Sequence, residues 1–231
     1  MANYMKKIIA VFFPLVLLVL NFSCQAAPQP QAVNEDDSMV LGIEPGEHWL
    51  GKMKVFIFSI KTTPQFAAWI EDENGNFVSN IAVTTKSAKE NWKNAPKEGR
   101  PESLPVWTFK QKNNQGIGEL DAVSMATPKD SMEAKIDENS LVIGNTYNIF
   151  LEINRSFDYN ERWTEENSGV NGQPSLVYKA GFTAGTGKNA RLNPIGHGSA
   201  DGSDGSITEE LGDLTTALTM MKSAYFVLKI R

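Results

Sequence analysis

Cysteine and histidine are almost absent from this chain. Cys24 is the only cysteine among 231 residues, so no disulfide can form within the chain and packing must hold the fold together. The two histidines, His48 and His197, are far apart in the sequence and lack the paired spacing of zinc sites. We therefore predict neither a disulfide scaffold nor a metal site.

An excess of basic residues is absent too. The chain holds 22 lysines and arginines against 27 acids, which gives a net charge of −5. Lys6 and Lys7 are the only charged residues in the first 24, so the rest of the chain has 20 bases, 27 acids and a net charge of −7. Proteins bind nucleic acid through clustered lysines and arginines. No such cluster is visible, and we predict no nucleic-acid partner.

No apolar run is long enough to span a membrane as a helix. The longest covers residues 8–20, whereas a spanning helix needs about 20 residues. Lys6 and Lys7 precede this run, which is the order of a secretory signal peptide. We therefore predict a signal peptide over residues 1–24 and an exported protein of the periplasm or outer cell envelope.

Cys24 directly follows this segment, at the place where a bacterial lipoprotein signal has its lipidated residue. Ser23 suits the position before the cysteine, whereas Asn21 stands where leucine is usual. Ordinary signal-peptidase cleavage near residues 25–27 is the alternative. If Cys24 is acylated, its lipid is the only membrane contact that we expect.

Residues 25–38 are rich in proline, glutamine and acids and lack large apolar side chains. This composition predicts a flexible linker. The remaining residues, 39–231, are enough for one large domain. We predict that they form a single β-sandwich.

The stretch around Asn74 and Gly75 has the pattern of a β-hairpin. Two β-rich runs flank this dipeptide, which readily supplies positive φ at both central positions of a two-residue turn. We expect a hairpin over residues 66–85, with one face of each strand suited to burial. Residues 55–60 are almost continuously apolar, which predicts a central strand or one covered on both faces.

Alternation of apolar and polar side chains recurs along the chain. It is clearest in residues 146–154, where Tyr147, Ile149, Leu151 and Ile153 share one face. Further strands are expected at 39–43, 106–110, 132–136, 176–182 and 224–230, a helical turn or two at 211–221, and a long glycine-rich turn or loop at 185–205. We therefore predict an all-β fold, an antiparallel sandwich of about seven to nine strands with long loops.

Two irregular segments, residues 86–115 and 155–172, are rich in aromatic side chains. Such side chains in loops either stack on a ligand or cover the open end of a sandwich and complete its core. We take Trp107, Tyr159 and Trp163 as the candidate ligand-binding residues. Trp92 and Phe157 belong to the same set.

Several phrases of the sequence resemble one bacterial family of predicted periplasmic proteins, catalogued as domain of unknown function 2271. They are residues 66–85, RPESLPVW at 100–107, DAVSMATP at 121–128, TYNIFLEINRSFDYN at 146–160 and NGQPSLVYKA at 171–180. The resemblance implies an exported protein with an immunoglobulin-like β fold. It also implies a family often associated with genes for flavin transfer and for membrane redox proteins.

The DAVSMAT phrase looks like the signal at which a transferase joins FMN to threonine through a phosphoester. By this comparison Thr127 would carry the flavin, and the transferase would read Asp121 and Ser124. Met125 departs from the pattern, because a small residue is usual there. The alternative is a strand end and a turn, with Pro128 stopping the pairing. Short motifs of this kind often match by chance.

We find no catalytic constellation in the sequence. The leading hypothesis is an exported cell-envelope sandwich that acts as a non-catalytic binding or redox-accessory module, with an envelope redox or membrane protein as partner and covalent FMN as the candidate cofactor. The alternative is an envelope hydrolase or other enzyme whose site lies in the loops 86–115 and 155–172. That would require titratable side chains to converge in a pocket, and solvent-facing Asp158, Glu161 and Glu165 would count against it.

Overall fold

The computed structural model describes residues 38–55, 57–89, 99–113, 123–186 and 188–229. The predicted signal peptide and all of the predicted linker except Ser38 lie outside these ranges. So do three residues singled out above, Cys24, Trp92 and Asp121. Among the described residues no helix is long and apolar enough to cross a membrane.

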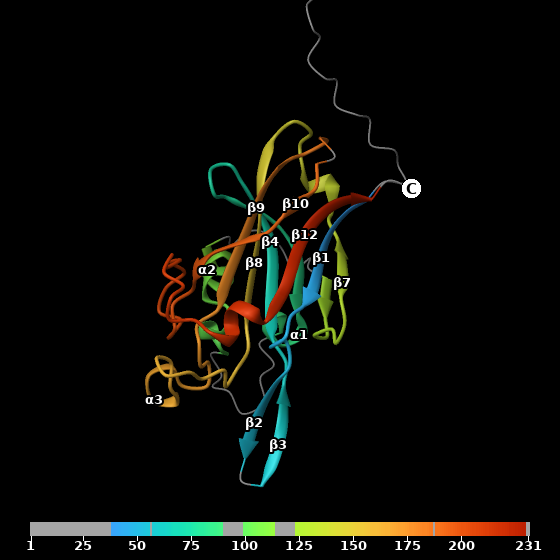
Figure 1. Cartoon of the computed structure of the whole chain (residues 1–231). Coiled ribbons are helices and arrows are strands. Elements are labelled where there is room, and N and C mark those ends of the chain that lie inside the picture. The colour runs from blue at the N-terminus through green and yellow to red at the C-terminus, as the bar shows by residue number, and fades with distance from the viewer. Residues whose placement is uncertain (1–37, 56, 90–98, 114–122, 187, 230–231) are drawn as a thin grey trace, which may run out of the picture.

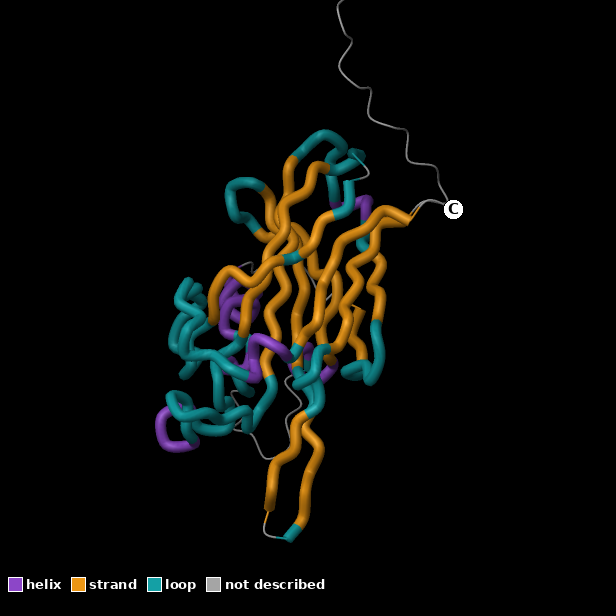
Figure 2. Tube along the Cα trace, viewed as in Figure 1, coloured by secondary structure: helices purple, strands orange, loops and turns teal. Residues whose placement is uncertain are grey.

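Two facing β-sheets make up the body of the molecule (Figures 1 and 2). One sheet has the strand order β10-β12-β1-β7 and the other β11-β9-β8-β4-β5-β6. All pairings are antiparallel except that of β6 with β5. The predicted all-β antiparallel sandwich is confirmed. The strands are β1 (Ser38–Pro45), β4 (Gln65–Asp72), β5 (Phe77–Thr84), β6 (Val123–Met125), β7 (Met132–Lys135), β8 (Thr146–Asn154), β9 (Leu176–Thr183), β10 (Ala190–Arg191), β11 (Asn193–His197) and β12 (Met221–Lys229).

The described residues form more strands than the seven to nine expected. A two-stranded ribbon, β2 (Gly51–Val55) with β3 (Phe58–Thr62), adds a pair. β10 and β11 lie within residues 185–205, which we predicted to be a long turn or loop. They are short edge strands: β10 has only two residues, and Pro194 and Gly196 interrupt the alternation in β11. Helical structure is limited to α1 (Thr85–Ala88), α2 (Pro105–Asn113), α3 (Glu165–Ser168) and 3-10 turns at Pro101–Ser103, Glu138–Ser140 and Thr216–Thr219.

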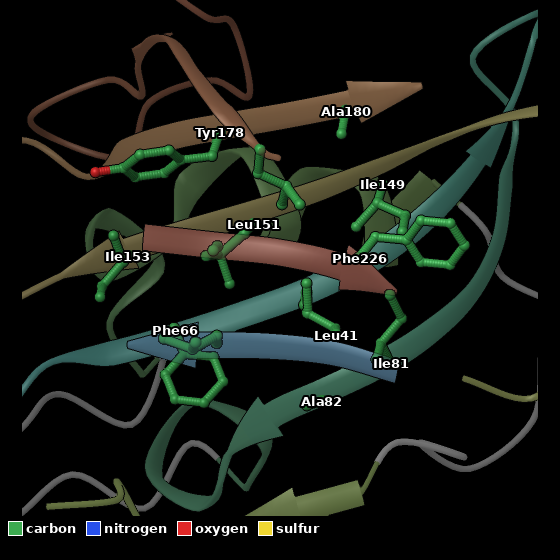
Figure 3. Packing of buried hydrophobic residues seen from close by; sticks show 14 of the residues in the cluster. Leu41, Phe66, Ile81, Ala82, Ile149, Leu151, Ile153, Tyr178, Ala180 and Phe226 are labelled. Atoms are coloured by element: carbon green, nitrogen blue, oxygen red, sulfur yellow. The ribbon is translucent and has the colours of Figure 1, made fainter. Parts of the chain in front are cut away.

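The main core lies between the two sheets. It is built from the alternating residues that the sequence pattern singled out, among them Phe66, Ile149 and Leu151, which meet Leu41 and Phe226 of the facing sheet (Figure 3). A period-two pattern puts such residues on one face of each strand. Their contacts across the sandwich are therefore a direct consequence of the sequence.

A second apolar cluster covers the outer face of the six-stranded sheet. Trp69 of β4 and Phe150 of β8 stack there with ring centroids 5.3 Å apart, and Trp107 of α2 packs on the same cluster. β4 and β8 are consequently buried on both faces, and not on one as we expected for the hairpin and for residues 146–154. The half-polar pattern of β8 concealed this, because Glu152 and Asn154 are buried as well.

Residues 106–110 are helical, so the strand predicted there is wrong. α2 begins at Pro105, and proline is favoured in the first turn of a helix because its missing N–H would be unpaired there in any case. The N–H of Thr108 bonds the carbonyl of Leu104 at 2.9 Å, which starts the helical pattern.

The predicted hairpin forms as β4 and β5, but its turn differs from the expected one. Only Gly75 has positive φ, at 80°, and Asp72 pairs with Asn76 through a backbone hydrogen bond of 2.9 Å. The Asp72 carboxylate accepts from the N–H groups of Asn74 and Asn76. These side-chain bonds to the backbone favour a longer loop over the two-residue turn.

The apolar run at 55–60 is not a central strand, and that prediction is wrong. The chain folds back within it, between β2 and β3, and the resulting ribbon extends away from the sandwich (Figure 1). Ile57 at the turn is 90% exposed. A short apolar run has the same composition in a buried strand and at an exposed tip, so composition alone could not separate the two.

Candidate functional site

The phrase that resembles a flavin-attachment signal includes β6 and ends at Thr127. Thr127 lies beside the residues that join the β2–β3 ribbon to the sandwich. Ser124 pairs in register with Val83 of β5, and Asp121 lies outside the described residues. Met125 is half-buried and packs against the main core. The bulky residue at this motif position is therefore explained by packing. Ala126 is exposed and Thr127 is half-buried.

The hydroxyl of Thr127 is held by its neighbours. It donates a 2.8 Å hydrogen bond to the carbonyl of Pro64, and the Nε2 atom of Gln65 lies 3.5 Å from its Oγ1. One residue further on, the indole of Trp49 donates to the carbonyl of Pro128 at 2.8 Å. Hydrogen bonds thus hold the segment at both Thr127 and Pro128, and the Thr127 hydroxyl lies between Pro64 and Gln65.

Two buried side-chain oxygens, on Gln65 and on its partner across the sheet, have no hydrogen-bond partner within the structure. They are Oε1 of Gln65 and Oδ1 of Asn154, which belong to residues paired directly across β4 and β8. The amide orientation of Gln65 is set by its 2.9 Å hydrogen bond from Nε2 to the carbonyl of Pro64. Leaving a buried acceptor unpaired costs about 1–3 kcal/mol. A bound donor at this place would remove that cost.

Next along the chain is a buried ion pair between Arg155 and Asp158. Arg155 also donates to the carbonyl of His48 near the ribbon, and Asp158 accepts from Gln173 at 3.1 Å and from Thr216 at 2.7 Å. Asp158 does not face solvent, since its exposed fraction is 4%. Its oxygens are occupied by partners, and this network joins the ribbon root, the loop 155–172 and the 3-10 turn Thr216–Thr219.

Glu152 of β8 is a titratable group in a buried environment. Its side chain is fully buried and accepts from the N–H groups of Val106 (3.2 Å) and Trp107 (2.8 Å) and from the Ser175 hydroxyl (2.6 Å). Burial raises its pKa to about 7, and these three hydrogen bonds oppose the rise. We missed this residue because one glutamate in an alternating strand looks like a solvated side chain.

The three candidate aromatic residues do not come together. Trp107 is buried under α2, and its indole donates to Asn80 at 2.8 Å. Tyr159 donates to the carbonyl of Gly169 at 2.8 Å, and burial, followed by the nearby Glu165 charge, raises its pKa. Trp163 packs at the edge of the main core with its indole nitrogen unpaired within the structure. Trp163 thus packs on the main core, Trp107 on the outer face of the six-stranded sheet, and Tyr159 on its own loop.

The enzyme alternative would need titratable groups around an open pocket. Glu152 is closed off by α2, and Asp158 is engaged by Arg155, while Glu161 and Glu165 are exposed. Among the described residues no group of three His, Cys, Asp or Glu side chains lies close enough to hold a metal ion. The end of the sandwich around Thr127 and Gln65 is therefore the best candidate site.

Comparisons with known proteins add no relative. No family model, no curated protein and no solved structure matches the chain. The resemblance to the periplasmic family thus stays a prediction, and the candidate site depends on its own geometry.

Proposed function

We propose that this protein is an exported, non-catalytic redox-accessory module of the cell envelope that carries FMN on Thr127. The observation that carries the proposal is the threonine at the end of the DAVSMAT phrase, whose hydroxyl lies beside an amide donor and a buried, unpaired acceptor. A redox or membrane protein of the envelope is the partner that such a carrier would serve.

The residues around Thr127 suit a phosphoester at this hydroxyl. Ester formation removes the hydroxyl proton, so Thr127 can no longer donate to the carbonyl of Pro64. That carbonyl still accepts from Nε2 of Gln65 at 2.9 Å, so it is not left unpaired. The other hydrogen of the same amide is available for the ester oxygen.

The unpaired oxygens of Gln65 and Asn154 are buried, so they would accept hydrogen bonds from a bound group only after the side chains around them move. FMN would supply electron-transfer chemistry, and the protein would supply its attachment and orientation. No titratable group of the chain needs to act in that role.

The test is the intact mass of the exported protein after co-production with a flavin transferase. We expect an added mass of one FMN less one water, located by fragmentation to the peptide that contains Thr127. Thr127→Ala should abolish it. Thr186→Ala is the matched control, because the Thr186 hydroxyl also donates to a backbone carbonyl at 2.8 Å but lies outside the motif.

An unmodified wild-type mass would remove the carrier hypothesis and leave a binding module without flavin. An added flavin that persists in Thr127→Ala would move the attachment elsewhere. Loss of flavin in both variants would point to a general folding defect, which the melting temperatures of the variants would reveal.

A further inference from the structure

The β2–β3 ribbon stands outside both sheets and has a distinctive composition. Figure 1 shows it extending from one end of the sandwich. Residues 50–62 contain three lysines and no acid, in a chain with a net charge of −5. Ile57 at the turn is 90% exposed, the highest value among the exposed large apolar side chains of the described residues. The ribbon is therefore basic and has an apolar tip.

The strand register places basic and apolar side chains of the ribbon on different faces. Lys52 pairs directly with Lys61, and Met53 pairs with Ile60. Successive residues of a strand point to opposite faces, so one face presents the two lysines and the other presents methionine and isoleucine. Toward the tip the register continues with the pairs Lys54–Ser59 and Val55–Phe58.

This arrangement is unfavourable in water. Like charges directly opposite each other on a two-stranded ribbon are destabilising, and neither Lys52 nor Lys61 forms an ion pair with any described residue. Ile60 is 48% exposed. A lone two-stranded ribbon is itself only marginally stable. An anionic surface with an apolar layer beneath it would relieve all three defects.

We propose that the ribbon docks on an anionic lipid bilayer, with Ile57 inserted at the interface and Lys52 and Lys61 near the headgroups. Lysine side chains can extend their stems along apolar surface while keeping the charge at the headgroups. Insertion is limited to the tip, because unpaired backbone groups at the ribbon edges cannot enter hydrocarbon. This contact is separate from any lipid on Cys24 and independent of flavin on Thr127.

A second copy of the chain fits the ribbon less well than a bilayer does. Pairing two ribbons through their basic faces would bring four lysines together, and pairing through their apolar faces would leave the lysine pairs without anions. The negative net charge of the whole chain opposes its approach to an anionic membrane, whereas the ribbon carries three lysines and no acid. The electrostatic asymmetry therefore orients the molecule with the ribbon toward the bilayer.

The test is flotation of residues 25–231 with vesicles, produced without the signal peptide and Cys24 so that neither the apolar segment nor an acyl chain is present. Vesicles of equal parts phosphatidylcholine and phosphatidylglycerol should bind it, and vesicles of phosphatidylcholine alone should not. Added salt should weaken the binding, because it screens surface charge. Lys52→Gln with Lys61→Gln should weaken it about 25-fold, since each lysine at an anionic surface contributes about fivefold.

Substitution of the tip provides the second arm. Ile57→Asp should weaken vesicle binding by at least about tenfold, because the burial of one aliphatic side chain is lost. Its matched control is Ile143→Asp, an isoleucine that is 68% exposed in the loop before β8, at the opposite end of the sandwich. Lys135→Gln with Lys188→Gln is the control for charge, and both controls should bind as the parent does.

Equal binding to neutral and anionic vesicles would overturn the proposal, and so would an Ile57→Asp variant that binds as well as Ile143→Asp. A protein that ignores vesicles but is retained on an immobilised acidic polypeptide would assign the ribbon to a protein partner instead. Dimerisation in sedimentation without vesicle binding would assign it to a second copy.

Discussion

Glu152 shows how one buried carboxylate joins a strand to a helix. The first N–H groups of a helix have no partner within the helix, and Glu152 on β8 supplies acceptors for those of Val106 and Trp107 in α2. A negative charge at a helix N-terminus is also favoured by the helix dipole. Burial opposes the charge and raises the pKa to about 7, so the interaction depends on pH.

Titration of Glu152 should make the protein less stable as pH rises from 4.5 to 7. In this window the folded protein keeps a proton that the unfolded chain, with a pKa of 4.5, has lost, so the proton stabilises the folded state. Its contribution is complete below pH 4.5 and is lost as pH rises through about 7, a change of roughly 3 kcal/mol. Urea unfolding midpoints across this range measure it.

Glu152→Gln should remove this pH dependence, because the amide does not titrate. Glu161→Gln, at an exposed position, is the control and should leave the pH profile of the parent unchanged. A Glu152→Gln variant that keeps the full decline from pH 4.5 to 7 would assign the effect to another group.

The loop 155–172 is closed on itself at one point. Asp158 and Gly172 form an isolated parallel bridge, and the N–H of Gln173 donates to the carbonyl of Asp158 at 2.9 Å. Gly172 has φ of 74°, and a Cβ there would lie 2.6 Å from the Asp158 nitrogen. The close approach of two backbone segments therefore requires glycine, and it brings Asp158 to Arg155.

Gly172→Ala should lower the free energy of unfolding by roughly 3 kcal/mol or more, since the clash with backbone adds to the cost of positive φ. Gly144→Ala is the matched control. Its φ is 88° and nothing lies within 4 Å of the added Cβ, so only the conformational cost of about 1–2 kcal/mol applies. Chemical denaturation measures both variants. Equal losses of unfolding free energy in the two variants would mean that the backbone at Gly172 can move away from Asp158 without cost.

At the scale of the whole molecule, the six-stranded sheet is the middle layer. The main core lies on one of its faces, and the cluster around Trp69, Phe150 and Trp107 lies on the other. β4 and β8 are central strands covered on both sides, whereas β2 and β3 pair only with each other. Local opening should therefore be rare in β4 and β8 and frequent in β2 and β3.

Hydrogen exchange followed by mass spectrometry should rank these elements. We expect the amides of β4 and β8 to exchange only through global unfolding, and those of β2 and β3 to exchange through local opening, because few buried contacts hold the ribbon. On anionic vesicles the protection of the ribbon should rise while that of β4 stays unchanged. Equal protection of the ribbon and β4 in solution would contradict this layering.

Much of the sandwich could be predicted from the local sequence pattern, and each wrong prediction has an identifiable cause. The strand at 146–154 and the hairpin at 66–85 were predicted because period-two alternation depends on neighbours in the chain. Residues 106–110 were misread as a strand, because their helix is set by Pro105 and by the carboxylate of Glu152 from a distant strand. The apolar run at 55–60 was misread, because its burial depends on which other elements of the fold pack against it.

The same division applies to the candidate site. The chain by itself determined that alternating strands form the sandwich, since alternation is a property of adjacent residues, whereas the likeness of residues 121–127 to a flavin-attachment signal stays a prediction. Only the tertiary structure decided that the amide of Gln65 lies beside Thr127, that Asp158 is buried, and that Trp107, Tyr159 and Trp163 stand apart. Burial and hydrogen-bond partners depend on which distant strands become neighbours, and the pattern of adjacent residues does not specify those neighbours.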